Sequence, residues 1–110
     1  MNGKDNKGWN ALHVLCEHNS SEKLIDAIQL LIQSGIKVNE KDKDGRNALH
    51  LLCAHNSSDG LIDAVKVLIT FGIQVASNGF DARIILRENY VKENRDEILE
   101  LLDRAFLKST

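Results

Sequence analysis

The stretch NALHLLCAHNSS occupies residues 47–58, and residues 10–21 read NALHVLCEHNSS. Ten of these twelve positions are identical, and the two copies differ only at their fifth and eighth positions. Each copy carries two histidines and one cysteine. The string is therefore either a chemical site that occurs twice or a structural unit that the fold repeats.

The duplication extends well beyond this string. Residues 5–41 and 42–78 align without gaps over 37 residues, of which 21 are identical. A fixed period of this size is typical of stacked repeat proteins. In such proteins one repeat cannot bury its own apolar face, so neighbouring repeats bury it. The period favours the structural interpretation of the repeated string.

A first helix is predicted near the start of each unit. Asn10 and Asn47 are well placed as N-caps, because an Asn side chain can accept a hydrogen bond from the first helical turn. The apolar residues that follow recur at i, i+1, i+4 and i+5, which indicates a helix of about eight residues with one apolar face.

A second helix follows in each unit, and Ser21 and Ser58 are its candidate N-caps. This helix is apolar over more than half of its surface, so we expect it to pack between neighbours on both sides. Gly35 and Gly72 are predicted to end it, because glycine readily adopts the positive φ angle of a helix C-terminus. The polar residues 39–45 that follow suit a turn.

These strings resemble the ankyrin repeat. Residues 42–50, DKDGRNALH, and residues 5–13, DNKGWNALH, are similar to the ankyrin opening Asp-x-x-Gly-x-Thr-Pro-Leu-His. Residues 65–73, VKVLITFGI, are similar to the second ankyrin helix, Val-x-x-Leu-Leu-x-x-Gly-Ala. Asn and Ala replace Thr and Pro in both copies, and the period exceeds the family's about 33 residues. The resemblance implies an all-α helix-turn-helix solenoid with short β-hairpin or turn fingers.

We expect the third unit to be a degenerate C-terminal capping repeat, with Asp81 in place of the capping Asn. Residues 95–107 predict an amphipathic helix whose apolar stripe is Ile98, Leu101, Leu102 and Ala105. The predicted organisation is a single ankyrin repeat domain over 1–110, with repeats at 5–41 and 42–78 and the cap at 79–110.

No comparable cap precedes residue 5, although about three repeats is the usual minimum for such an array. Three expectations follow for the first repeat. The chain is a minimal protein, a fragment of a longer array, or a structural scaffold that forms a homodimer through its uncapped N-terminal face.

The resemblance implies a non-catalytic protein-binding module, because ankyrin partners usually contact the turn tips and the inner face of the first helix. The matching positions are Asn6, Lys7, Trp9, Glu17, His18, Lys43, Asp44, Arg46, Ala54, His55 and Phe80. Trp9, Arg46 and Phe80 share one column after the turn glycine, which is rich in residue types found at binding hot spots. The alternative is that Trp9 covers the first face and Phe80 packs under the shorter third turn. The identity of the partner is not predicted.

The histidines and cysteines suggest a second alternative, a zinc-binding module. The weak candidate ligands are His13, Cys16, His50 and Cys53, with His18 and His55 as further donors. The ankyrin resemblance implies instead that His13 and His50 are structural and hydrogen-bond loop backbone of a neighbouring repeat, and that the cysteines pack as small apolar residues. A Cys16–Cys53 disulfide and a catalytic Cys–His pair are both disfavoured.

Asn39 is a candidate modification site. Residues 31–39, LIQSGIKVN, place a Leu eight residues before a Val-Asn pair. This pattern resembles the site at which ankyrin domains are often modified by an asparaginyl hydroxylase. The alternative is an unmodified turn asparagine.

The composition limits the possible partners. A net charge of −2 gives no basic excess for nucleic acid or an anionic membrane. No apolar run approaches the roughly 18 residues of a membrane span, and the first residues are polar, so we expect an intracellular protein, cytoplasmic or nuclear. No glycine-rich phosphate loop or paired carboxylates appear, and we expect no cofactor and no enzymatic activity.

Overall fold

A computed structural model of the chain describes residues 3–6, 8–18, 23–56 and 60–108. Within these residues the chain forms a series of helices and one small antiparallel sheet. The elements are α1 (Ala11–His18), α2 (Leu24–Gln33), α3 (Ala48–His55), α4 (Leu61–Thr70), β1 (Ala76–Ser77), β2 (Phe80–Asp81), α5 (Ala82–Asn89) and α6 (Arg95–Lys108). The all-α helix-turn-helix prediction is confirmed. No helix in the described residues is both long and apolar enough to cross a membrane.

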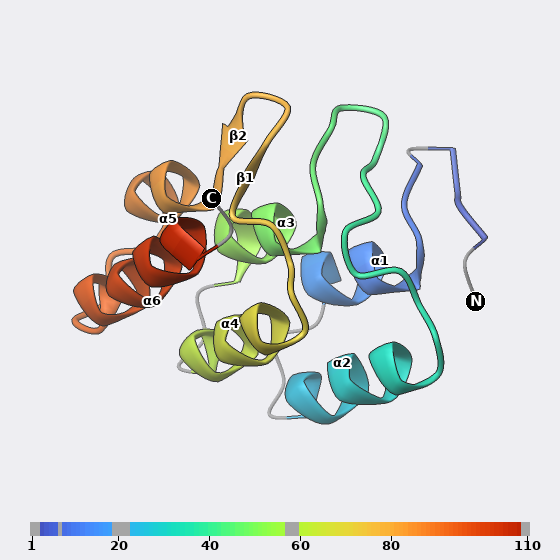
Figure 1. Ribbon diagram of the computed structural model, residues 1–110, viewed down its shortest axis with the longest axis horizontal. Helices are drawn as coiled ribbons and strands as arrows, with labels where there is room; N and C mark the ends of the chain where they lie inside the picture. The colour runs from blue at the N-terminus through green and yellow to red at the C-terminus, as the bar shows by residue number, and fades with distance from the viewer. Residues whose placement is uncertain (1–2, 7, 19–22, 57–59, 109–110) are drawn as a thin grey trace.

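The helices form two stacked rows (Figure 1). Helix α3 contacts α1 on one side and α5 on the other, which makes an inner row. Helix α4 lies in the same way between α2 and α6. The segments before α1, α3 and α5 project from the inner row as three fingers (Figure 1). The boundaries predicted at residues 41/42 and 78/79 stay a prediction.

The inner helices begin at the predicted caps. Asn47 Oδ1 accepts a hydrogen bond from His50 N at 3.1 Å, and His50 Nδ1 accepts one from Asn47 N at 3.1 Å. Asn10 and His13 repeat this reciprocal geometry at the start of α1. Asp81 caps α5 by accepting from the backbone N–H of residue 83. The reciprocal pairs at α1 and α3 each satisfy two backbone N–H groups, and Asp81 satisfies one at α5.

The second helices begin without a side-chain cap. The N-cap residues of α2 and α4 are Lys23 and Gly60, and neither makes a side-chain capping bond. The predicted caps Ser21 and Ser58 lie outside the described residues. Both helices are followed closely by a glycine with positive φ, as predicted.

Packing is complete in the middle of the stack and incomplete at its N-terminal end. On α3, Leu49, Leu51 and Leu52 are each 0% exposed. The expectation that the second helix is packed on both sides is wrong for α2, because α2 packs on α1 and α4 and still leaves Leu30 65% exposed. The stack has no described helix pair before α1 and α2 to cover that side.

Helix α6 matches the amphipathic helix predicted near the C-terminus. Ile98 and Leu102 are buried as predicted, but Leu99 is also buried whereas Leu101 is only half-buried. The buried stripe therefore contains Leu99 in place of Leu101, because α6 packs against both α4 and α5.

The fingers are built in two ways. In the second finger, Asp42 Oδ1 accepts a hydrogen bond from Arg46 N at 2.8 Å, and Gly45 takes a φ of 92°. The third finger is a β-hairpin in which Asn78 and Gly79 form the loop, both with positive φ. Positive φ at both loop residues is the geometry of a type I′ turn, which matches strand twist. The two finger types agree with the predicted mixture of turns and hairpins.

We expect Gly45→Ala to destabilise the protein more than Gly35→Ala. Both glycines have positive φ, so each substitution carries a backbone cost of about 1–2 kcal/mol. A Cβ at residue 45 would also lie 2.8 Å from the Cβ of Asn78, whereas one at residue 35 meets nothing within 4 Å. Urea unfolding of the two variants isolates this contact between fingers, and equal losses would contradict it.

Candidate functional site

A hollow of about 440 Å³ lies between the first two fingers and the ends of α1 and α3. We call it the finger hollow. Its lining residues are Asn6, Trp9, Glu17, Lys43, Asp44, Arg46 and His55. All seven are among the positions at which the sequence predicts partner contacts. Two fingers and the ends of two helices therefore bring these residues together.

The remaining predicted contact positions do not line this hollow. His18 is exposed at the end of α1, Ala54 is half-buried on α3, and Lys7 lies outside the described residues. Phe80 is half-buried in the third finger, where its ring lies 5.9 Å from the ring of His50. The predicted column of Trp9, Arg46 and Phe80 thus contributes two of its members to the finger hollow.

The carboxylate of Asp42 joins two residues that line the finger hollow, Trp9 and Arg46. Its Oδ2 accepts hydrogen bonds from Trp9 Nε1 at 3.0 Å and from Arg46 Nε at 3.2 Å, and its Oδ1 accepts from two backbone N–H groups of its own turn. Burial opposes ionisation of Asp42, but these donors outweigh it and hold the pKa of this carboxyl below its usual 3.8. The first two fingers are joined through one buried charge.

Sequence reasoning did not assign Asp42 to the site. The signal was present, because Asp5 and Asp42 are identical in the two copies and Asp5 closes the same turn by accepting from Trp9 N at 3.0 Å. What could not be foreseen was the bond to the indole of Trp9, which joins residues 33 positions apart.

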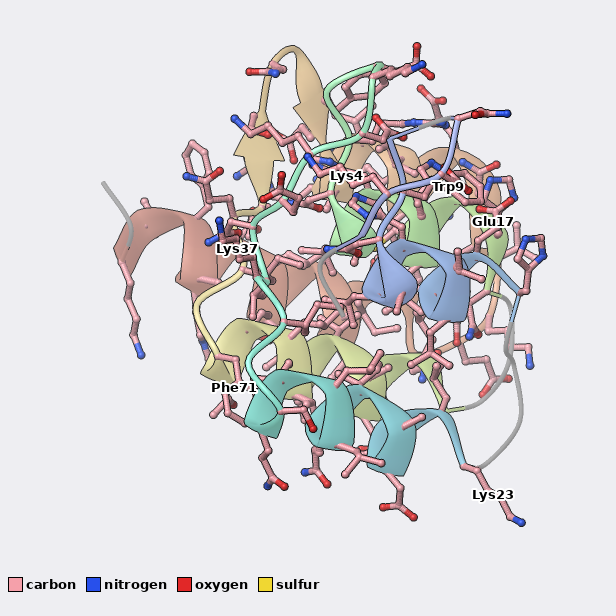
Figure 2. The ribbon with its side chains drawn as sticks, turned by 90° about the vertical axis from the view of Figure 1, so that its right-hand side faces the viewer. Lys4, Trp9, Glu17, Lys23, Lys37 and Phe71 are labelled. Atoms are coloured by element: carbon pink, nitrogen blue, oxygen red, sulfur yellow. The ribbon has the colours of Figure 1, made fainter. Side chains whose placement is uncertain are left out.

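The Trp9 side chain lines the finger hollow but does not project into solvent. It is 6% exposed, and its ring lies 6.2 Å from the ring of His18. Figure 2 shows Trp9 and Glu17 at the same side of the molecule, next to the end of α1. Trp9 therefore shapes the wall of the hollow, while the exposed Lys43 and Asp44 form its rim.

A family model described as ankyrin repeats (3 copies) matches residues 1–79. The chain belongs to the ankyrin repeat family. Ankyrin repeats are generally protein–protein interaction modules, and the family is typically non-catalytic. A search of curated proteins finds no match to this chain. Helices α5 and α6 lie beyond the matched residues and continue the same stack.

The ankyrin histidines are both engaged with backbone. His13 Nε2 lies 3.1 Å from the carbonyl oxygen of Arg46, and His50 Nε2 lies 3.0 Å from that of Val75. Each Nδ1 accepts the hydrogen bond of a cap N–H, so each Nε2 carries the proton and donates. The two ring nitrogens of each histidine are occupied, which leaves neither free for a metal. The described residues contain no group of three side chains able to hold a metal ion.

The cysteines are free thiols buried between helices. Burial raises the pKa of Cys53 to about 12 and raises that of Cys16 even further from its usual range. Because the thiolate is the nucleophile and the metal-binding form, neither thiol is activated for chemistry. Both pack as small apolar residues in the core.

Asn39, the predicted modification site, links two connecting loops of the ankyrin stack. Its Nδ2 donates to the carbonyl oxygen of Gly72 at 3.0 Å, and its Oδ1 accepts from Gln74 N at 2.7 Å. Both polar atoms of the amide are therefore used in the folded domain. Hydroxylation of Asn39 stays a prediction.

We expect the free energy of unfolding to fall as the pH is lowered from about 7.5 to about 5.5. Burial lowers the pKa of His13 and His50 below the usual 6.5, against the opposing effect of their carbonyl partners. Below pH 6.5 the unfolded chain then binds more protons than the folded one, so stability is present above this pH and lost beneath it.

Urea unfolding of a His13→Gln, His50→Gln double variant measures this effect, which should be smaller than in the parent protein. A matched variant with the exposed His18 and His55 replaced by Gln controls for the loss of imidazole groups. An unchanged pH dependence in the first double variant would contradict the assignment. The carboxyls of Asp42 and Asp81 do not confuse the measurement, because their usual pKa of 3.8 is already below this range.

Proposed function

We propose that this ankyrin domain binds a protein partner through its turn tips and inner helix face, with the finger hollow as the contact site. The observation that supports this proposal is the convergence of seven predicted contact positions on one concavity. These positions come from two fingers and two helices, so closeness in the sequence does not explain why they meet in one hollow. The proposed binding involves no catalysis and no cofactor.

The chemistry of the rim suits recognition of a peptide segment. Arg46 Nε lies 3.2 Å from Asp42 and Arg46 Nη2 lies 3.3 Å from Asp44, so the guanidinium is held before a partner arrives. Side chains that are already ordered lose less conformational entropy on binding. Lys43 and Asp44 add one exposed charge of each sign, which favours a specific polar partner over a purely apolar one.

We expect Lys43→Glu to weaken binding of a peptide selected from a randomised library against the protein. Reversal of a rim charge should raise the Kd at least about tenfold, which is about 1.4 kcal/mol. Fluorescence anisotropy measures the Kd directly. Lys66→Glu is the matched control, because Lys66 is equally exposed but lies on α4, away from the finger hollow. Equal effects of the two substitutions would contradict the proposal.

A second candidate function is self-association through the N-terminal face. Helices α1 and α2 form a groove, here named the lateral groove, and Figure 2 looks onto this side of the molecule. Its lining residues are Ala11, Val14, Leu15, Ala27, Leu30 and Leu31, all apolar. In the second repeat the residues equivalent to Val14 and Leu15 are Leu51 and Leu52, which are both 0% exposed.

The charge at the other end of the stack supports a two-fold dimer over a chain of molecules. The exposed residues of α6 are mainly charged and include Glu100, Asp103 and Arg104. Head-to-tail packing would place these charges against the apolar lateral groove, which costs desolvation free energy. Pairing of two lateral grooves about a two-fold axis buries apolar surface on both copies and closes the assembly.

We expect sedimentation velocity over a wide range of protein concentration to show a reversible dimer that Leu30→Glu abolishes. The added carboxylate would be buried without a partner in the dimer, whereas it stays in water in the monomer. Val91→Glu is the control, because Val91 is also exposed (87%) but lies at the opposite end of the stack. A protein that is monomeric at every concentration would exclude this second function.

A further inference from the structure

The two thiols of the ankyrin stack mark two equivalent interfaces. Cys16 on α1 and Cys53 on α3 occupy the same position of the twelve-residue string, and each is 1% exposed. The lateral groove lies on the side of α1 formed by Ala11, Val14 and Leu15. At about 100° per residue, Cys16 is on the opposite side of this helix, which faces α3. By the same spacing Cys53 lies on the side of α3 that faces α5.

The two ends of the stack are closed differently. At the C-terminal end, Arg83 on α5 donates a hydrogen bond to Asp103 on α6 at 3.0 Å, and its Cζ lies 4.2 Å from the centre of the Phe106 ring. At the N-terminal end of the two rows (Figure 1), α2 begins without a side-chain cap and leaves Leu30 65% exposed. The α1–α2 pair is therefore the less firmly held end of the stack.

Polar bonds join the first repeat to the second finger. Trp9 Nε1 donates to Asp42 Oδ2 at 3.0 Å, and His13 Nε2 donates to the carbonyl oxygen of Arg46 at 3.1 Å. The second finger is also closed from within, because Asp42 Oδ1 accepts from two backbone N–H groups of its own turn. The turn of the second finger therefore does not depend on the first repeat.

An end repeat is held by one interface and a middle repeat by two. Separation of α1–α2 from α3–α4 breaks one interface, whereas release of α3–α4 breaks both. A lone helix pair cannot bury its own apolar face, so a separated pair unfolds. We propose that the first finger, α1 and α2 open reversibly as one unit while the rest of the stack stays folded. This inference goes beyond the proposed function and does not depend on it.

Alkylation of the unmodified protein with iodoacetamide tests this opening, at a concentration at which the protein sediments as a monomer. Digestion and mass spectrometry distinguish the two thiols, because their surrounding sequences differ at Val14 and Leu51. A buried thiol reacts only when its interface opens, so its rate follows the opening equilibrium. We expect Cys16 to react at least about tenfold faster than Cys53 without urea. Equal rates, or a faster Cys53, would overturn the inference.

Trp9→Phe tests whether the opening occurs at the first interface. The substitution keeps an aromatic ring but removes the N–H group that bonds Asp42. Loss of a hydrogen bond to a charged group should raise the alkylation rate of Cys16 about fivefold or more and leave the other thiol unchanged. Tyr90→Phe is the matched control, because it removes one hydrogen bond of a buried aromatic residue at the other end of the stack. If Trp9→Phe changes both rates equally, or neither, the inference fails.

Opening of the first repeat dismantles the finger hollow, and its effect on binding rests on the proposed function. Asn6, Trp9 and Glu17 belong to the opening unit, whereas the other lining residues belong to the part that stays folded. A peptide selected against the protein should therefore bind only the closed form. It should slow Cys16 alkylation by a factor of one plus the ratio of free peptide concentration to Kd.

The outcomes separate the opening from the proposed function. A peptide that binds without slowing the alkylation of Cys16 would refute the coupling and would place its binding site outside the finger hollow. If no peptide binds, the proposed function fails. In both cases the ratio of the two thiol rates still decides whether the first repeat opens alone.

Discussion

A helix pair of this size cannot cover both of its own apolar faces, and the rest of the structure follows from that constraint. The pair formed by α3 and α4 meets it fully, with a neighbouring pair on each side. The pair formed by α1 and α2 meets it on one side only, so residues equivalent to the core of the next repeat lie open in the lateral groove. The same rule that builds the solenoid therefore also leaves an open apolar surface at its N-terminal end.

The fingers need a different solution, because they have little apolar surface of their own. In the fingers, the buried carboxylate of Asp42 connects neighbouring repeats, as apolar side chains do in the helix stack. Asp42 shapes its own turn through backbone donors, and it joins the first finger through the indole of Trp9. Hydrogen bonds to a buried charge depend on direction, whereas apolar contacts do not. The bonds to Asp42 therefore fix the relative position of the two fingers. The finger hollow has a defined shape for this reason.

Local and periodic features were predictable from the sequence. The caps Asn10, Asn47 and Asp81 depend on side chains three or fewer residues from their partners, and the structure confirms all three. Contacts between repeats were harder to foresee. The sequence favoured Trp9 as an exposed binding residue, but its hydrogen bond to Asp42 holds the indole in the wall of the finger hollow. The sequence showed that the third finger is shorter. It did not show that His50 would hydrogen-bond the carbonyl oxygen of Val75, a residue of its own predicted repeat.

The two copies of the twelve-residue string also separate what folds this protein from what is available for binding. Identical positions in the described part supply the cap, the structural histidine and the buried thiol. The two differing positions in the first copy are Val14, which lines the lateral groove, and Glu17, which lines the finger hollow. Their counterparts, Leu51 and Ala54, line neither surface. The other ten positions of the string are identical in the two copies. The two differences in the first copy therefore fall on the two surfaces that the stack leaves open.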